Sequence, residues 1–118
     1  MKKHFDLNER TALFAENTIV VLRKVKRDSI TNGMIDQCMR ATGSVGANYC
    51  EASEAESSKD FIHKMRIAKK ETKESQHWFR LLAKAVPELQ KEFRILWQEA
   101  QELVLIFAKS VDTANKGK

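Results

Sequence analysis

Proline, glycine and cysteine are scarce in this chain of 118 residues, which holds one proline, four glycines and two cysteines. So few helix-breaking residues, together with 42% hydrophobic residues, exclude a disordered chain and favour an all-helical globular protein. The length suits one small domain with a single core, which we assign to residues 1–118. We therefore expect an all-α fold in one domain.

Long hydrophobic runs are also missing. The longest, Leu103 to Ala108, is far shorter than the roughly 20 residues that a membrane-spanning helix needs. The first residues, from Met1 to Asp6, have basic side chains but no apolar stretch after them, so we expect no signal peptide. These absences predict a cytoplasmic protein without a membrane partner.

The two cysteines cannot pair with each other. Cys38 and Cys50 fall on one predicted helix, about 18 Å apart along its axis, which excludes a disulfide between them. Two buried, reduced thiols are expected, and they fit a reducing compartment.

The spacing of apolar residues predicts four helices, followed by a polar, frayed tail at 112–118. Their approximate ranges are 7–27, 32–54, 58–85 and 87–111. Asp6 with Glu9, and Ser57 with Asp60, have the spacing of N-terminal capping boxes. A turn is expected from Asp28 to Gly33, with Asn32-Gly33 as its strongest local signal. The short connections predict an antiparallel, up-down-up-down four-helix bundle. The core face of the last helix is expected at Leu89, Phe93, Leu96, Ala100, Val104, Phe107 and Val111.

The second predicted helix contains two glycines, Gly43 and Gly46, which each cost roughly 1 kcal/mol inside a helix. A helix tolerates this cost when small residues let a neighbouring backbone come close. We therefore expect a central, close-packed helix here. A loop that separates two shorter helices is the alternative.

Two helices carry more apolar surface than one bundle core can bury. Leu13 and Val20 lie off the core face of the first helix. On the last helix, one outer face forms a second set, which we call the acidic stripe. Its members are Glu88, Glu92, Ile95, Glu99, Glu102 and Ile106. These residues predict the interface of a homo-oligomer, which closes into a ring if the rotation between subunits permits.

The third predicted helix has a face made only of basic and imidazole side chains at a strict 4-3 spacing, which we call the basic stripe. Its members are Lys59, His63, Arg66, Lys70, Lys73, His77, Arg80 and Lys84. They fall within an arc of about 100° and extend about 37 Å, a length that could follow a nucleic-acid backbone. A subunit contact and a plain solvated face are the alternatives, although a solvated face usually mixes charges of both signs.

The sequence contains little that resembles a catalytic or a metal-binding motif. Glu74 and His77 have the Glu-x-x-His spacing of di-iron bundles, and Asp60 with His63 has a similar but weaker pattern. Both motifs lie on one helix, and their histidines are expected to face outward, whereas a di-iron site needs such motifs on two helices facing inward. Neither cysteine has a histidine or acid in a recognisable relation to it, and no glycine-rich phosphate loop is present. We expect no catalytic residues, no metal and no cofactor.

Four polar residues are expected on or near the inward side of the bundle: Asn17, Asn48, Glu51 and Glu74. Buried polar groups are costly, so these should pair with one another or with backbone. A structural role in fixing the helix register is favoured over a catalytic one.

The segment Ser44-Val45-Gly46-Ala47-Asn48-Tyr49-Cys50-Glu51-Ala52 carries a resemblance to a known family, together with Asp60-Phe61-Ile62, Ile67-Ala68-Lys69 and Glu74. It resembles the four-helix-bundle proteins encoded by intervening sequences in bacterial 23S rRNA genes, over roughly residues 10 to 110. Ala52 and Lys70-Glu71 stand where the family has glycine and Gly-Ser, which indicates a divergent branch. The signature residues matching Asn48, Glu51 and Glu74 are structural.

The resemblance implies a homopentameric barrel. A related protein, the accessory variability factor of diversity-generating retroelements, binds nucleic acid and its reverse transcriptase. A reverse transcriptase or another protein is therefore an implied partner, beside RNA or DNA and further copies of the chain.

Two hypotheses follow for the function of this non-enzymatic bundle. In the first, the basic stripe binds RNA or DNA. In the second, the protein is an oligomeric scaffold whose charged stripes are used up as subunit contacts.

Overall fold

The structure, a computed structural model, describes residues 6–117 and is all-α, with no strand in that range. Residues 1–5, on which the absence of a signal peptide rests, lie outside the described residues. The helices are α1 (Leu7–Leu22), α2 (Thr31–Ser53), α3 (Ser58–Ala85) and α4 (Gln90–Lys116), and a short 3-10 helix, η1 (Pro87–Leu89), precedes α4.

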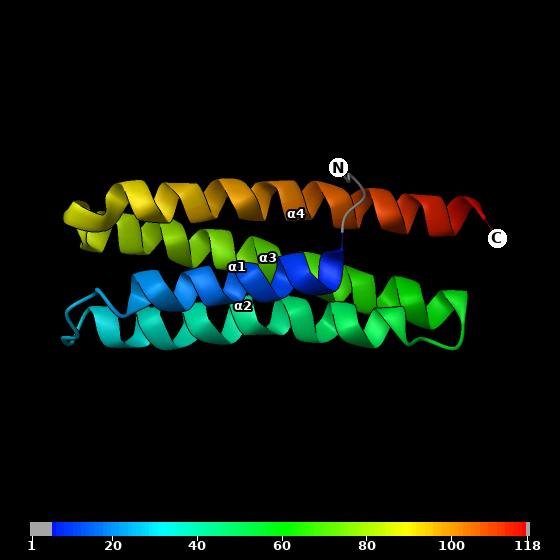
Figure 1. Cartoon of the computed structure of the whole chain (residues 1–118), viewed down its shortest axis with the longest axis horizontal. Helices are drawn as coiled ribbons and strands as arrows, with labels where there is room; N and C mark the ends of the chain where they lie inside the picture. Colours follow the sequence, from blue (N-terminus) through cyan, green and yellow to red (C-terminus); the bar gives the residue numbers. More distant parts are fainter. Residues whose placement is uncertain (1–5, 118) are drawn as a thin grey trace.

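The four helices lie side by side along a bundle whose Cα extents are 48 × 33 × 18 Å. Figure 1 shows the α1–α2 and α3–α4 connections at one end and the α2–α3 connection at the other. α2 and α4 each contact both α1 and α3, so the core lies in the space that the four helices surround. No helix within residues 6–117 combines the length and the apolarity needed to cross a membrane.

α1 begins where the sequence predicts but ends earlier. Asp6 is the N-cap, and its carboxylate accepts a hydrogen bond of 3.2 Å from the backbone amide of Glu9. The helix stops at Leu22 instead of about residue 27, because the next segment folds around Asp28. Asp28 accepts from the amides of Ile30 and Thr31, and these bonds lower its pKa.

This Asp28 turn connects the first two helices and lies within the turn predicted at Asp28 to Gly33. The Thr31 hydroxyl closes the turn by donating to the Lys26 carbonyl at 2.9 Å. The helix begins at Thr31, so the predicted turn is confirmed at its start but is too long by Asn32 and Gly33, which belong to the first turn of α2.

α2 is one continuous helix through both glycines, so the loop alternative is wrong. A Cβ at position 46 would lie 3.2 Å from the Thr11 hydroxyl oxygen of α1, whereas one at position 43 would meet nothing within 4 Å. Gly46 therefore allows a close approach of α1 and α2. Gly43 is exposed and allows none, so the expectation of close packing holds at one glycine only.

α3 begins as expected, whereas α4 differs from expectation at its C-terminal end and on its core face. Ser57 caps α3 as expected, accepting from the Asp60 amide at 3.0 Å. α4 continues to Lys116, so the frayed tail expected from residue 112 is wrong within the described range; Val111 is buried and supports the last turns. Val104 was expected in the core, but the fully buried residue at this turn is Leu103. With 3.6 residues per turn, a 4-4 spacing from Leu96 and Ala100 leaves the core face, and a step of three residues returns to it.

Aromatic rings cross the core from three helices. Phe79 of α3 meets Phe14 of α1 edge-on, with ring centroids 5.9 Å apart. It also stacks against Phe93 of α4 at 6.4 Å. All three side chains are buried, so this cluster joins α1 to α3 and α4 through the middle of the bundle.

The contact between α1 and α4 includes a cluster of ion pairs. Arg10 of α1 binds Glu99 with two hydrogen bonds of 2.7 and 2.9 Å and Glu102 with one of 2.7 Å. These carboxylates raise the pKa of Arg10 further, Glu99 most strongly. Beside them, a groove of about 650 Å³ is lined partly by Leu13 and Ile95. The two helices are thus held by an ion-pair cluster next to an apolar groove.

The two glycines of α2 predict opposite effects of one substitution. Gly46→Leu should lower the free energy of unfolding by about 1–3 kcal/mol, because the new side chain overlaps Thr11. The matched change Gly43→Leu should raise it by up to about 1 kcal/mol, since it removes the helix penalty of glycine in open space. Urea unfolding followed by circular dichroism measures both, and similar effects at the two positions would contradict the close contact.

The Arg10 cluster predicts a difference between two ion pairs that reach α4, one from α1 and one from the segment that follows it. Arg10→Ala should lower the free energy of unfolding by about 1.5–3 kcal/mol, because the Arg10 side chain is only 18% exposed and Glu99 would lose its charged donor. Lys24→Ala is the control: Lys24 and Glu92 are 4.0 Å apart and 52% and 37% exposed, so the loss should stay within about 0.5 kcal/mol. Equal losses in urea titrations would refute this assignment.

Candidate nucleic-acid interface

The basic stripe lies on the outer face of α3, and all eight of its side chains are exposed. The opposite face of the helix is buried through Met65, Ala68, Phe79 and Leu82. Two hydroxyls on that buried face are satisfied within the helix, since Thr72 donates to the Ala68 carbonyl and Ser75 to that of Glu71. Burial of the inner face therefore fixes the direction of the stripe.

No member of the basic stripe forms an ion pair with a described residue within 4.0 Å. Two acids of α3, Glu71 and Glu74, both bind Arg40 of α2. Lys64, which is not part of the stripe, pairs with Glu51 of α2 at 2.6 Å. The charges between α2 and α3 are thus neutralised among themselves, and the stripe remains cationic.

Glu74 lies at the centre of a side-chain network between α2 and α3. Its carboxylate accepts from the indole Nε1 of Trp78 at 3.1 Å and from the guanidinium of Arg40. The Trp78 hydrogen bond, followed by the Arg40 contact, lowers the pKa of Glu74 and keeps it ionised. The ring of His77 meets that of Trp78 edge-on, with centroids 5.0 Å apart.

The expected structural polar residues are only partly where the sequence placed them. Glu74 is half-buried, but Glu51 and Asn17 are exposed, so their inward placement is wrong. Asn48 is half-buried and donates to the Ser44 carbonyl of its own helix at 2.9 Å. None of these residues pairs with another of the set. Helical backbone, Arg40 and Lys64 supply the partners instead.

The acidic stripe of α4 is mostly engaged within the chain. Glu99 and Glu102 bind Arg10, and Glu92 lies near Lys24, while Glu88 is exposed. Glu99 and Glu102 already have a partner within the chain, although the Glu102 side chain stays 66% exposed. Their role in a subunit interface stays a prediction.

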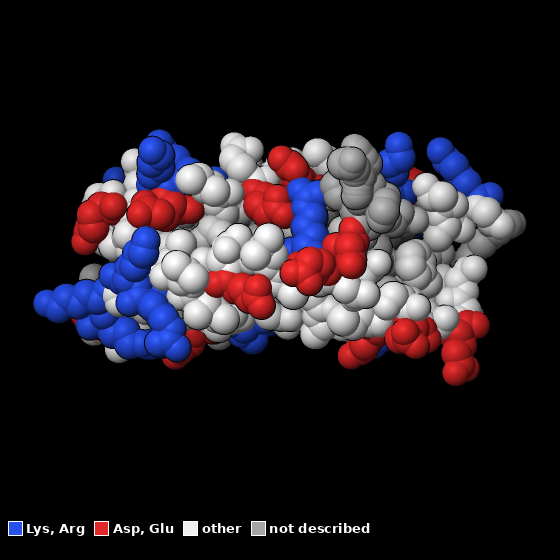
Figure 2. Space-filling view, in the orientation of Figure 1, with Lys and Arg blue, Asp and Glu red and all other residues white. Residues whose placement is uncertain are grey.

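The apolar members of the expected interface differ in exposure. Leu13, Val20 and Ile95 are 47%, 57% and 61% exposed, which is high for large apolar side chains. Ile106 is half-buried and lines a groove that Phe61 of α3 also lines, so it is not the freely exposed residue that was expected. In the orientation of Figure 1, acidic side chains interrupt the uncharged surface over α1, and Lys and Arg gather where α1 joins α2 (Figure 2).

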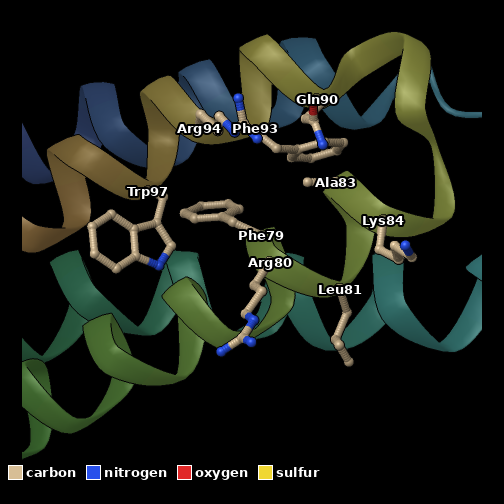
Figure 3. Close-up of a pocket in the computed structure, with 9 residues that line it drawn as sticks. All are labelled: Phe79, Arg80, Leu81, Ala83, Lys84, Gln90, Phe93, Arg94 and Trp97. Atoms are coloured by element: carbon tan, nitrogen blue, oxygen red, sulfur yellow. The ribbon is translucent and has the colours of Figure 1, made fainter.

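The basic stripe ends at a pocket that sequence reasoning missed. α3 and α4 enclose a space of about 570 Å³, whose lining includes the stripe members Arg80 and Lys84 together with Arg94 and Trp97 of α4. Figure 3 shows Phe79 and Trp97 reaching into the space between the helices, while Arg80 and Lys84 extend outward from α3. The three-residue spacing of Arg94 and Trp97, beside the core positions Phe93 and Leu96, is the signal that could have indicated them.

The cysteines and acids offer no clear reactive centre. Cys38 is buried, and burial raises the pKa of its thiol to about 12, which keeps it protonated and a poor nucleophile. Cys50 is exposed, contrary to the expectation of two buried thiols, and its Sγ lies 3.4 Å from the Asn8 side-chain oxygen. Within residues 6–117, no group of three His, Cys, Asp or Glu side chains is arranged to hold a metal ion.

Comparison with known proteins agrees with the fold and with the sequence resemblance. The fold is similar to a crystal structure of a protein with unknown function from the S23 ribosomal protein family of Bacteroides thetaiotaomicron VPI-5482, with a TM-score of 0.78 and 25% sequence identity. The similarity covers 88% of this chain and 96% of that one. No curated protein sequence matches the chain. Residues 3–109 match the family described as 23S rRNA-intervening sequence protein, and the chain therefore belongs to this family.

Proposed function

We propose that this protein is a non-enzymatic, nucleic-acid-binding bundle and that the basic stripe of α3 is its binding surface. The observation that carries the proposal is the row of exposed basic and imidazole side chains without an ion-pair partner among the described residues. Such a row matches a phosphate backbone, which carries regularly spaced negative charge. The proposed setting is the cytoplasm.

The chemistry of the stripe favours contacts to phosphate over recognition of sequence. Six of its eight members are lysine or arginine on a straight helix face, and they repeat at intervals of three or four residues. Contacts of this kind position a nucleic acid but do not identify its bases. The ligand is therefore RNA or DNA bound with little sequence preference.

The scaffold hypothesis, in which the basic and acidic stripes of neighbouring subunits pair, has lost much of its support. Three of the four acids in the acidic stripe lie beside Arg10 of α1 or Lys24, which follows α1, in the same chain. A neighbouring subunit would have to break the Arg10 cluster to use Glu99 and Glu102. This competition leaves the basic stripe available to another anion.

Self-association is a separate part of the proposal and rests on apolar surface. Leu13 and Ile95 line the groove between α1 and α4, and Val20 is exposed further along α1. We propose that a second copy of the chain covers this surface, so that antiparallel, up-down-up-down bundles assemble into a ring. The family resemblance favours a homopentamer, with a reverse transcriptase or another protein as a further partner.

Charge reversal on the stripe tests nucleic-acid binding. Arg66→Glu combined with Lys70→Glu should weaken binding to duplex DNA and to RNA by at least about tenfold, since it removes two phosphate contacts and adds repulsion. For the wild type, the logarithm of affinity should fall with the logarithm of salt concentration, with a slope of about 0.9 per phosphate contacted on duplex DNA. Fluorescence anisotropy at several salt concentrations measures both.

A matched control separates local contacts from net charge. Lys26→Glu combined with Lys109→Glu reverses two exposed cations that lie outside the stripe, and it should weaken binding much less. An equal loss in both double variants would mean that overall charge, and not the stripe, attracts the ligand. Loss of the oligomer in the stripe variant alone would support the scaffold hypothesis instead.

The apolar groove predicts the effect of charge on assembly. Leu13→Glu combined with Ile95→Glu should lower the molar mass measured by light scattering, because burying two new carboxylates between subunits is costly. Ala47→Glu, on the exposed face of α2, is the control and should leave the mass unchanged. A wild-type protein that is monomeric at micromolar concentration would refute self-association.

A further inference from the structure

The pocket at the end of the basic stripe combines aromatic surface with positive charge. Trp97 is half-buried and presents its indole at the space between α3 and α4, beside the buried ring of Phe79 (Figure 3). The exposed cations Arg80, Lys84 and Arg94 also line the pocket, and the lining contains no acid. A ligand that suits this lining has a flat aromatic group and negative charge close to it.

The pocket is also continuous with the basic stripe. Arg80 and Lys84 are the last two members of the stripe, and both line the pocket. If a nucleic-acid backbone follows the stripe toward the C-terminal end of α3, the base attached next to its phosphates would lie close to Trp97. The volume of about 570 Å³ lies within the ordinary range of small-molecule sites.

We propose that this pocket takes up an unpaired base of a single-stranded nucleic acid, which stacks on Trp97 while the phosphates beside it contact Arg80, Lys84 and Arg94. The proposal rests on the binding function of the stripe and adds that single strands are preferred over duplexes. A base inside a duplex is stacked and paired, so it cannot enter the pocket without the cost of extrusion. Stacking on an aromatic side chain tolerates any base, which agrees with a stripe that does not identify sequence.

The second tryptophan, Trp78, provides a contrast on the same helix as the stripe. Its indole Nε1 is bound to Glu74, and its ring is in contact with His77. It also lies outside the lining of the pocket. Since the chain has only two tryptophans, Trp78→Phe leaves Trp97 as the single indole reporter.

The first experiment uses this Trp78→Phe protein and measures tryptophan fluorescence during titration with short oligothymidylate. Stacking of a base on Trp97 should quench the emission as binding saturates. An oligodeoxynucleotide of the same length made of abasic sites carries the same phosphates without bases, so it should bind through the stripe without this quenching. Equal emission changes with the two ligands, or binding of oligothymidylate without any change, would overturn the proposal.

The second experiment measures affinity. Trp97→Leu keeps an apolar side chain but removes the aromatic face, and it should weaken binding of oligothymidylate by about tenfold or more. Affinity for the abasic strand and for duplex DNA should stay within about twofold, which also reports that the variant is folded. If Trp97→Leu fails to fold, the fluorescence titration of the Trp78→Phe protein decides alone.

The outcomes distinguish this proposal from the function on which it rests. If wild-type protein binds duplex, abasic and single strands equally and Trp97→Leu changes nothing, the pocket proposal is wrong while the basic stripe still binds phosphates. If no nucleic acid binds at low salt, the proposed function itself is wrong. Suppose that the stripe variant with Arg66→Glu and Lys70→Glu no longer binds any nucleic acid, while Trp97→Leu loses binding of the single strand only. The proposed function and the pocket proposal are then both supported.

Discussion

The placement of one aromatic side chain, Phe79, determines the direction in which the basic stripe of α3 faces. Its ring is held between Phe14 and Phe93, which belong to two other helices, so α3 cannot rotate about its axis without losing both contacts. Residues on a helix are related by 100° steps, and an inward Phe79 therefore directs Lys73 and Lys84 outward. The direction of the basic stripe is a consequence of core packing.

Among the described residues, the buried hydroxyl groups make no hydrogen bonds between helices, so they do not determine which helices become neighbours. Thr18, Thr72 and Ser75 each donate to a carbonyl of their own helix, and no buried side-chain nitrogen or oxygen of residues 6–117 lacks a partner. The contacts that select neighbours are instead at the margins of the core. Arg40 joins α2 to α3, and Arg10 joins α1 to α4.

Helix periodicity was sufficient to predict four helices and the face of α3 that carries the basic stripe, and the capping-box pattern predicted the capping residues Asp6 and Ser57. It failed where side chains from distant parts of the chain meet. Nothing in the spacing of α4 indicates that Glu99 will find Arg10, which is 89 residues away in the sequence. The pocket at Trp97 was missed for the same reason, since it exists only where α3 and α4 come together.

The intramolecular pairing of acids has a consequence for the way in which an anion would reach the protein. Glu99 and Glu102 are bound to Arg10 on the α1–α4 side, whereas the cations on the outer face of α3 have no ion-pair partner among the described residues. A polyanion near the molecule would be attracted toward this unpaired charge before any contact forms. Such attraction raises the rate of association rather than the lifetime of the complex, and added salt would slow the encounter first.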